Sequence, residues 1–287
     1  MKKAGAIIIL YYPEVDEVLN MLAELSSDLE SVVLIDNTPI PMKIDFSQFS
    51  NVTHCKLGKN VGLASAQNQG LKHLLDLGCR FAFIFDQDTQ IGAQYIKSML
   101  QVWNDANDQM LAAIGPQIIC EFSDTIESPV IQTPYRKSNG LHYVKQIISS
   151  GMMLDLDKIK DIGLKEDGLF IDAVDHEWCW RAGKYAYAVA QTPEVQIRHR
   201  MGVERKTLFA CSYKVGQPIR HYYQVRNVLL LLTRPYVPFY WKIRNIGMIF
   251  VRLVLVILQG DNKLSRMSYI FQGLLDGLRR KSGKLNK

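Results

Sequence analysis

The hydrophobic pattern of residues 1–120 alternates between short apolar runs and longer stretches with helical spacing. The apolar runs have the length and aromatic or β-branched content of buried strands, and lie at residues 6–11, 31–36, 52–57, 81–85 and 112–120. Apolar residues recur every three or four positions at residues 15–29, 64–77 and 94–106, which predicts helices. This succession predicts an α/β fold with a mostly parallel sheet and helices on both faces.

The second half of the chain continues this pattern and then departs from it. Residues 121–145 are polar and rich in turn formers, which predicts a long loop or an edge hairpin. Strands are predicted at residues 147–154, 185–190 and 195–199, and a helix at residues 174–183. Long helices follow at residues 213–234, 238–259 and 264–280. We therefore divide the chain into an α/β domain, residues 1–205, and a C-terminal helical region, residues 206–287.

The predicted helix at residues 238–259 is unusually apolar. Asn245, Arg252 and Gln259 recur every seven residues and so share one narrow stripe, while the rest of the surface is almost wholly apolar. Such a helix is either enclosed in protein or lies in a membrane interface. No stretch offers about 20 uninterrupted apolar residues, so we expect no ordinary transmembrane helix.

Charge is distributed unevenly along the chain. The net charge of +6 combines an acidic part and a basic part, since residues 198–287 carry 18 basic and 3 acidic side chains. A basic region of this kind predicts an anionic partner, and we expect an anionic membrane surface. Nucleic acid is not favoured, because no recognition motif accompanies the basic residues. The alternative is that these helices pack on the α/β domain or form the interface of a homo-oligomer.

The cysteines and the N-terminus bear on the cellular compartment. The five cysteines are scattered and none has C-x-x-C spacing, which favours free thiols in a reducing compartment over disulfides or a zinc site. The apolar run after Lys3 is short and ends at Pro13, so we interpret it as a first strand rather than a signal peptide. We therefore expect a cytoplasmic protein.

Two carboxylates directly follow the most apolar predicted strand, in the sequence Asp86-Gln87-Asp88. Ligands of open α/β sheets bind outside the carboxyl ends of the strands. Asp-x-Asp on a turn can present both carboxylates to one hard divalent cation, which prefers oxygen ligands. The alternative is a solvated turn with two acids.

Two further segments are candidates for nucleotide binding. Asp36 ends the second strand and could accept hydrogen bonds from a base or a ribose, or it could simply stabilise a turn. The segment from Asn60 to Gly70 begins a helix with small residues, and a helix N-terminus favours phosphate. The alternative for Gly62 is tight packing of this helix on the sheet.

Acids, aromatics and a histidine cluster near residues 170–200. Asp175 lies in the first turn of a predicted helix and could face a cleft as a general base. Glu177 and Arg181 are four residues apart, which predicts a structural ion pair. Trp178 and Trp180 could stack on a sugar or belong to the core. His199, between two arginines, is a candidate metal ligand or phosphate contact, with a structural role as the alternative.

Together these stretches resemble the inverting GT-A glycosyltransferases of family two. The resemblance covers about residues 4–202 and rests on Tyr11-Tyr12-Pro13, Asp36-Asn37, Asn60-Val61-Gly62 through Asn68-Gln69-Gly70, Asp86-Gln87-Asp88 and Asp175-His176-Glu177-Trp178. Other segments look like the bacterial L-rhamnosyltransferase branch: Ser149-Ser150-Gly151, Phe170-Ile171-Asp172 and Tyr222-Tyr223-Gln224-Val225-Arg226-Asn227. One departure is Val174, where many relatives place an acid.

The resemblance implies a role for each matching residue. Asp175 would be the catalytic base, with Glu177 as its nearest rival. Acceptor-binding or supporting roles fall to Glu177, Trp178, Ser150 and Gly151. The nucleotide-sugar site would contain Tyr11, Asp36, Asn60, Gly62, Asn68, Asp86 and Arg198. Mg²⁺ or Mn²⁺ would be held by Asp86, Asp88 and His199.

The resemblance also implies the substrates. The donor would be dTDP-L-rhamnose, and the acceptor a polyprenyl-diphosphate-linked oligosaccharide at the inner face of the bacterial cell membrane, in synthesis of O-antigen or another surface polysaccharide. Alternatives are a UDP-sugar donor, a nucleotidyltransferase that releases pyrophosphate, and a scaffold on the membrane surface without activity. Loss of function in Asp88→Ala and Asp175→Asn would exclude the scaffold.

Overall fold

The computed structural model describes residues 3–41, 44–120, 125–126, 133–199, 204–208, 211–215, 217–258 and 262–285. For residues 120, 125–126, 199, 204–208 and 211–215 it describes the backbone alone.

The strands are β1 (Ala4–Leu10), β2 (Ser31–Asp36), β3 (Val52–Lys56), β4 (Phe81–Asp86), β5 (Thr89–Gln90), β6 (Leu111–Cys120), β7 (Thr125–Ile126), β8 (Arg136–Ser138), β9 (Leu141–Val144), β10 (Met152–Asp155), β11 (Ala188–His199), β12 (Glu204–Leu208) and β13 (Cys211–Val215). The α-helices are α1 (Val15–Leu25), α2 (Leu63–Asp76), α3 (Tyr95–Ala106), α4 (Ile159–Ile162), α5 (Val174–Lys184), α6 (Arg220–Leu232), α7 (Phe239–Leu258) and α8 (Lys263–Leu278). Two 3₁₀ helices, η1 (Leu156–Lys158) and η2 (Asp167–Leu169), complete the described elements.

The N-terminal part of the sheet is parallel, in the order β3-β2-β1-β4. The predicted strands of this region are confirmed to within about two residues at each end. Within the sheet, Leu10 pairs with Asp36 and Ile9 pairs with Asp86. The carboxyl ends of β1, β2 and β4 therefore meet at one edge, which is where this class of sheet binds ligands.

The other half of the sheet is mixed rather than parallel. Strand β10 runs antiparallel between β4 and β6, and β9 and β8 form an antiparallel hairpin at the far edge. The expectation of a mostly parallel sheet is thus corrected, although the α/β class is confirmed. Strand β11 joins two segments predicted as separate strands, with an irregular register between Gln191 and Gln196. Pro193 lies in this irregularity and cannot donate to a ladder, so the sequence pattern looked broken there.

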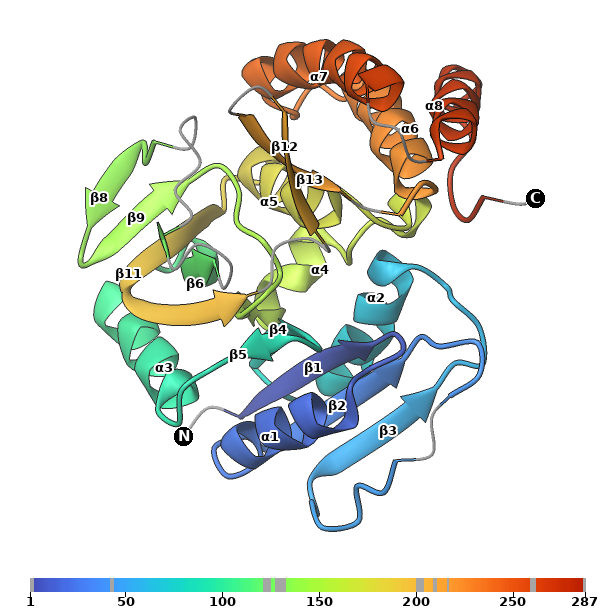
Figure 1. Ribbon diagram of the computed structural model, residues 1–287. Coiled ribbons are helices and arrows are strands. Elements are labelled where there is room, and N and C mark those ends of the chain that lie inside the picture. The colour runs from blue at the N-terminus through green and yellow to red at the C-terminus, as the bar shows by residue number, and fades with distance from the viewer. Residues whose placement is uncertain are drawn as a thin grey trace.

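Helices cover both faces of the sheet (Figure 1). Helices α1 and α3 pack with Phe83 and Phe85 of β4 in one apolar cluster. Helices α2 and α5 pack with Ile84 on the opposite face. Neighbouring residues of β4 thus enter different cores, because successive side chains of a strand point to opposite faces.

The C-terminal region differs from the predicted helices at its start. Residues 211–215 form β13, which pairs with β12 in a hairpin, so α6 begins only at Arg220. Helices α7 and α8 follow the predicted ranges closely. The predicted domain boundary after residue 205 falls within β12, and the division into two parts stays a prediction. No helix within the described ranges has the length and apolarity needed to cross a bilayer.

Helix α6 is joined to the α/β core by a buried polar clamp. The Asn227 side-chain amide donates to the carbonyl groups of Leu169, Ile171 and Asp172 at 2.7–3.0 Å. Arg226 is fully buried and donates to the carbonyl groups of Gly168 and Leu169. The clamp fixes the segment that leads directly into α5.

We expect Asn227→Ala to lower the free energy of unfolding by about 2–4 kcal/mol, because several buried hydrogen bonds are lost together. Denaturant unfolding measures this change. The matched control is Asn104→Ala, the same substitution at an exposed position of α3, which should change stability by less than about 0.5 kcal/mol. Equal stability of the two variants would contradict the clamp.

Candidate active site

The edge formed by β1 and β4 is fastened by Gln87. Its side-chain oxygen accepts the Tyr11 N–H at 2.7 Å, and its side-chain nitrogen donates to the Tyr11 carbonyl at 3.3 Å. This pair of bonds fixes Asp86 and Asp88, on either side of Gln87, relative to the end of β1. The side chain of Tyr11 remains exposed beside them.

The tight turn before β10 contacts two carboxylates that are far apart in the sequence. The Ser150 hydroxyl donates to Asp86 at 2.5 Å, while both the N–H and the hydroxyl of Ser149 donate to Asp175. Gly151 completes the turn with φ +74°, and a Cβ there would lie 2.6 Å from the Tyr95 hydroxyl oxygen. Ser150 therefore orients Asp86, and Gly151 permits the turn that places both serines.

Asp175 also contacts the buried ammonium group of Lys165. The Lys165 Nζ lies 3.4 Å from Asp175 Oδ1 and 5.1 Å from the centre of the Trp178 ring. The lysine side chain is fully buried, whereas that of Asp175 keeps 18% of its surface exposed. Asp175 is thus held from the protein side and open on the other, as a general base that must reach a substrate requires.

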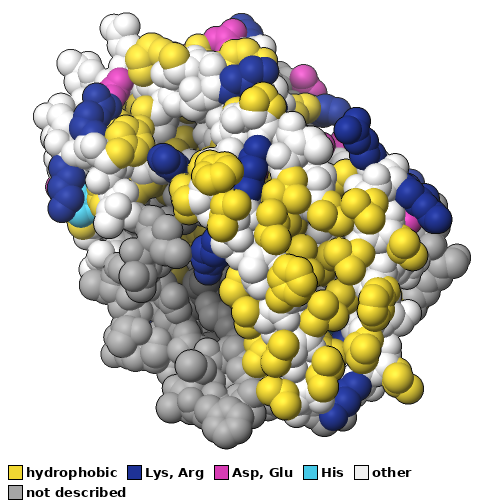
Figure 2. Space-filling view, turned by 90° about the horizontal axis from the view of Figure 1, so that it is seen from above, with side chains coloured by type: hydrophobic (Ala, Val, Ile, Leu, Met, Phe, Trp, Pro, Cys, Tyr) yellow, Lys and Arg dark blue, Asp and Glu magenta, His cyan; other side chains and the backbone are white. Residues whose placement is uncertain are grey.

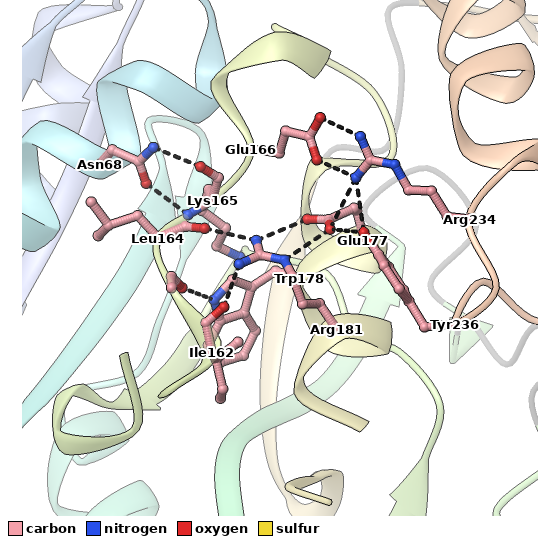
Figure 3. Close-up of polar contacts among 11 residues, drawn as sticks. Asn68, Ile162, Leu164, Lys165, Glu166, Glu177, Trp178, Arg181, Arg234 and Tyr236 are labelled. Atoms are coloured by element: carbon pink, nitrogen blue, oxygen red, sulfur yellow. Dashed lines mark hydrogen bonds and ion pairs between the residues drawn. The ribbon is translucent and has the colours of Figure 1, made fainter. Parts of the chain in front are cut away.

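Asn68 holds Lys165 in place (Figure 3). Its side chain donates to the Lys165 carbonyl at 2.8 Å and accepts the Lys165 N–H at 2.9 Å. A further bond joins it to Asp167 at 2.7 Å. Because the amide is buried and used in this way, the structure gives Asn68 a supporting position, and its predicted contact with the nucleotide remains a prediction.

Glu177 belongs to a buried network rather than to the open site (Figure 3). Its carboxylate accepts bonds from Arg181, Arg234 and the Tyr236 hydroxyl, and its side chain has no exposed surface. Burial raises the pKa of Tyr236 to about 12, so this hydroxyl remains a donor at neutral pH. The predicted ion pair with Arg181 is confirmed, and Glu177 cannot reach an acceptor or replace Asp175 as the base.

Trp178 is also a core residue. Its ring is fully buried, and its indole N–H donates to the Gly163 carbonyl at 2.9 Å. Trp180 is buried as well and lies edge-on to Trp241. The alternative that both tryptophans belong to the core is therefore the one the structure supports, and stacking of Trp178 on a sugar is not available.

The predicted nucleotide residues near β2 have well-defined structural contacts. Asp36 accepts the Thr38 N–H at 3.0 Å and lies 3.4 Å from His54, as expected of a turn aspartate. Asn60 accepts the Gly62 N–H at 2.9 Å. A Cβ at Gly62 would lie 2.5 Å from the Phe170 ring.

The N-terminus of α2 donates to protein groups. The N–H groups of Leu63 and Ala64 both donate to the Phe170 carbonyl, and that of Val61 donates to Asn37. Packing of helix on core thus accounts for the small residues here, and these amides are not free for phosphate. Contacts of Asn60 and Gly62 with a nucleotide stay predictions.

Strand β5 brings the segment after Asp88 next to the end of β11. Gln90 pairs with Arg198 and Thr89 pairs with His199 through the backbone. The His199 side chain lies outside the described part of the structure. In that part, no three His, Cys, Asp or Glu side chains gather as a metal site. Asp86 and Asp88 still offer the hard oxygen donors that Mg²⁺ and Mn²⁺ prefer.

Sequence reasoning missed Arg220. This residue opens α6 and forms a two-pronged ion pair with Asp172, with the shortest contact at 2.9 Å. Asp172 raises the pKa of Arg220, and the charge of Asp86 adds to the effect. Arg220 is far from Asp86 in the chain and follows no recognisable spacing, so no sequence signal marked it.

Comparisons with known proteins agree on one class of protein. No family model matches the chain. The dTDP-rhamnosyl transferase RfbF of Shigella flexneri is 29% identical, with 96% of this chain and 95% of that protein covered. The low-salt glycan biosynthesis hexosyltransferase Agl10 of Haloferax volcanii is 22% identical over 97% of this chain and 92% of its own length.

Solved structures show the same fold. S. aureus TarS 1-349 in complex with UDP-GlcNAc matches with a TM-score of 0.57 and 16% identity, over 96% of this chain and 81% of that one. GalNAc-T7 with UDP, GalNAc and Mn²⁺ matches with a TM-score of 0.54 and 12% identity, over 71% of this chain but only 44% of that one. The chain is a glycosyltransferase with the GT-A fold. The expected fold class and the expectation of a transferase are thereby confirmed.

If Asp175 is the base that the resemblance implies, we expect Lys165→Met to lower kcat about 10- to 100-fold, because a small misplacement of a catalytic group can cost that much. The KM for the sugar donor should change less than about twofold, since Lys165 contacts Asp175 and not the edge with Asp86. Steady-state kinetics separates the two constants. Lys160→Met, at an exposed position of α4, is the control. A rise in KM with unchanged kcat would contradict this role.

Proposed function

We propose that this glycosyltransferase transfers L-rhamnose from dTDP-L-rhamnose to a hydroxyl group of a lipid-linked glycan, with inversion at the anomeric carbon. The observation that carries the reaction type is the pair of adjacent serines, which join Asp86 at the sheet edge to Asp175 on α5. These contacts support an arrangement in which Asp86 serves the donor and Asp175 serves the acceptor. The choice of rhamnose rests on similarity to RfbF over nearly the whole chain.

The proposed reaction is a single displacement. Asp175 accepts the proton of the acceptor hydroxyl as its oxygen attacks the anomeric carbon, and the bond to the nucleoside diphosphate breaks on the opposite side. Ser149 and Lys165 hold Asp175 in the orientation required for proton transfer. Burial lowers the pKa of His176, which follows Asp175 in the chain. Its imidazole is therefore neutral near neutral pH and does not compete with Lys165 as a positively charged partner of Asp175.

We propose that Asp86 and Asp88 hold Mg²⁺ or Mn²⁺, with His199 as a third ligand. Such a cation, when bound, offsets the charge that develops on the leaving diphosphate. Arg220 adds a positive charge that interacts electrostatically with Asp86, and Arg198 is proposed to contact the nucleotide. The structure of GalNAc-T7 was solved with Mn²⁺, which supports a metal-dependent reaction in this fold.

The proposed setting is the inner face of a bacterial cell membrane, in O-antigen or other surface polysaccharide synthesis. The acceptor would be an oligosaccharide on polyprenyl diphosphate, and the enzyme would be a peripheral membrane protein that does not bind nucleic acid. A second candidate function is transfer from a UDP-sugar, because the matched structures of TarS and GalNAc-T7 contain UDP-GlcNAc or UDP.

We expect Asp175→Asn to lower turnover at least about 10³-fold while the donor still binds, because the amide cannot accept the proton. Product formation and donor-dependent thermal stabilisation measure the two effects. The control is Asp16→Asn, at an exposed position of α1, which should retain full activity. Full turnover in Asp175→Asn would exclude Asp175 as the base.

The metal and the donor can be tested together by thermal stabilisation, since a ligand that binds only the folded state raises the melting temperature. With Mg²⁺ or Mn²⁺ present, dTDP-L-rhamnose should stabilise the protein more than UDP-GlcNAc does. EDTA should abolish most of this donor-dependent stabilisation in the native protein. In Asp88→Ala, EDTA should change the donor-dependent stabilisation very little.

Two results would contradict this proposal. Stronger stabilisation by UDP-GlcNAc would favour the second candidate function. Equal stabilisation by dTDP-L-rhamnose with and without EDTA would exclude the metal role of Asp88.

A further inference from the structure

Helix α7 has two apolar faces, and only one of them is covered. Trp241, Asn245, Ile249 and Val256 are buried against the rest of the C-terminal region. On the opposite face, large apolar side chains are exposed at helical spacing: Phe239, Ile243, Ile246, Phe250, Val254 and Ile257. Phe250 alone is 66% exposed. The spacing of three or four residues places this second set on one continuous stripe.

Helix α8 extends the exposed apolar surface. Leu264, Phe271, Leu275 and Leu278 are exposed and also recur at helical spacing. Figure 2 shows hydrophobic side chains gathered in one patch on this face of the molecule. In the described part of the chain, twelve of the nineteen exposed large apolar side chains lie on α7 and α8. A contiguous patch of this kind marks an interaction surface.

The charges around this patch are mostly positive. Residues 239–285 contain nine basic and two acidic side chains, although Arg252 and Arg266 of this set are turned into the protein. One of the two acids, Asp276, is buried and bonded to Tyr222 and Lys281. Lys and Arg side chains border the patch in Figure 2, and in the sequence Lys263 precedes Leu264 and Arg279 follows Leu278.

We infer that the apolar faces of α7 and α8 dock the enzyme on an anionic lipid bilayer, with α7 lying in the plane of the interface. An apolar stripe with basic borders fits this partner, because the apolar side chains enter the acyl region while the basic ones meet anionic headgroups. A symmetric contact with a second copy would bring the same basic border against itself, and like charges repel.

The inference deepens the proposed function and rests on it only for the acceptor, which would be lipid-linked. Helix α7 packs with α6 and with Trp180 of α5 in one apolar cluster. Helix α6 is the helix that holds the segment before α5 through Asn227 and Arg226. Asp172 also acts on Arg252 of α7, whose pKa is lowered mainly by burial. The docked surface and the Asp175 site therefore belong to one packed unit, and the bilayer would lie at a fixed distance from the base.

The test compares three full-length proteins in co-sedimentation with vesicles of phosphatidylcholine, with and without about 30% phosphatidylglycerol. The first is the native chain, and the second carries Phe250→Ser, Val254→Ser and Ile257→Ser. The third is a matched control with Ile40→Ser, Leu77→Ser and Met110→Ser, at exposed apolar positions outside α7 and α8. Point substitutions are used rather than deletion of the C-terminal helices, because α6 packs extensively on α8 and would be exposed if α8 were removed.

We expect the native chain and the control to bind anionic vesicles at least about tenfold more strongly than neutral ones, and the α7 variant to bind anionic vesicles at least about tenfold more weakly than the native chain. Light scattering should give a monomer for all three. Equal vesicle binding of the native chain and the α7 variant, or a native dimer that the α7 substitutions dissociate, would overturn the inference.

Donor-dependent thermal stabilisation separates this result from the proposed function. All three proteins should retain it if they are folded, because the substituted side chains are exposed and none belongs to the proposed donor site. Vesicle binding without any response to nucleotide sugars would support the docking surface and contradict the transfer reaction. A response to nucleotide sugars without vesicle binding would contradict the docking surface alone.

Discussion

The site depends on one turn whose two adjacent serines each bind a carboxylate from a different element. Asp86 ends β4 and Asp175 lies on α5, and partly buried carboxylates are costly to hold without hydrogen-bond donors. Ser149 and Ser150 supply a hydroxyl to each, and Lys165 adds a buried positive charge on the side of Asp175. Gly151 permits the turn because its φ is positive and because a larger side chain would meet Tyr95. The rest of the fold holds these groups at fixed positions.

Support for this turn comes from the C-terminal region as well as from the sheet. Asn227 and Arg226 of α6 bind the carbonyl groups of residues 168–172, and the Phe170 ring stacks on Tyr223 at 4.8 Å. Phe170 in turn packs on Gly62 and accepts the first amides of α2. The C-terminal helices thus hold the segment that leads into α5 and belong to the same packed unit as the candidate site.

The sequence predicted the parallel half of the sheet well, because strands buried on both faces leave an unmistakable apolar run. The prediction failed where one sequence pattern is compatible with two different structures. The bulge at Pro193 looked like a loop between two strands, and residues 213–215, which belong to β13, looked like the start of a helix. Spacing also cannot tell which side of a helix is buried, so Glu177 remained a rival to Asp175, and Trp178 could be assigned either to the core or to a sugar. Arg220 depends on tertiary contact alone, and no local pattern encodes it.

Helix α7 shows how the same ambiguity can itself carry information. Its sequence allowed either a helix enclosed in protein or one at a membrane interface, and in the structure one face is buried in protein while the opposite apolar face is exposed. The polar stripe with Asn245 and Arg252 faces protein, which is opposite to the orientation of a surface helix whose polar side meets water. A helix that turns polar groups inward and apolar groups outward gains nothing from water on its outer face. The outer face therefore requires an apolar partner, and the basic residues around it indicate which apolar partner that is.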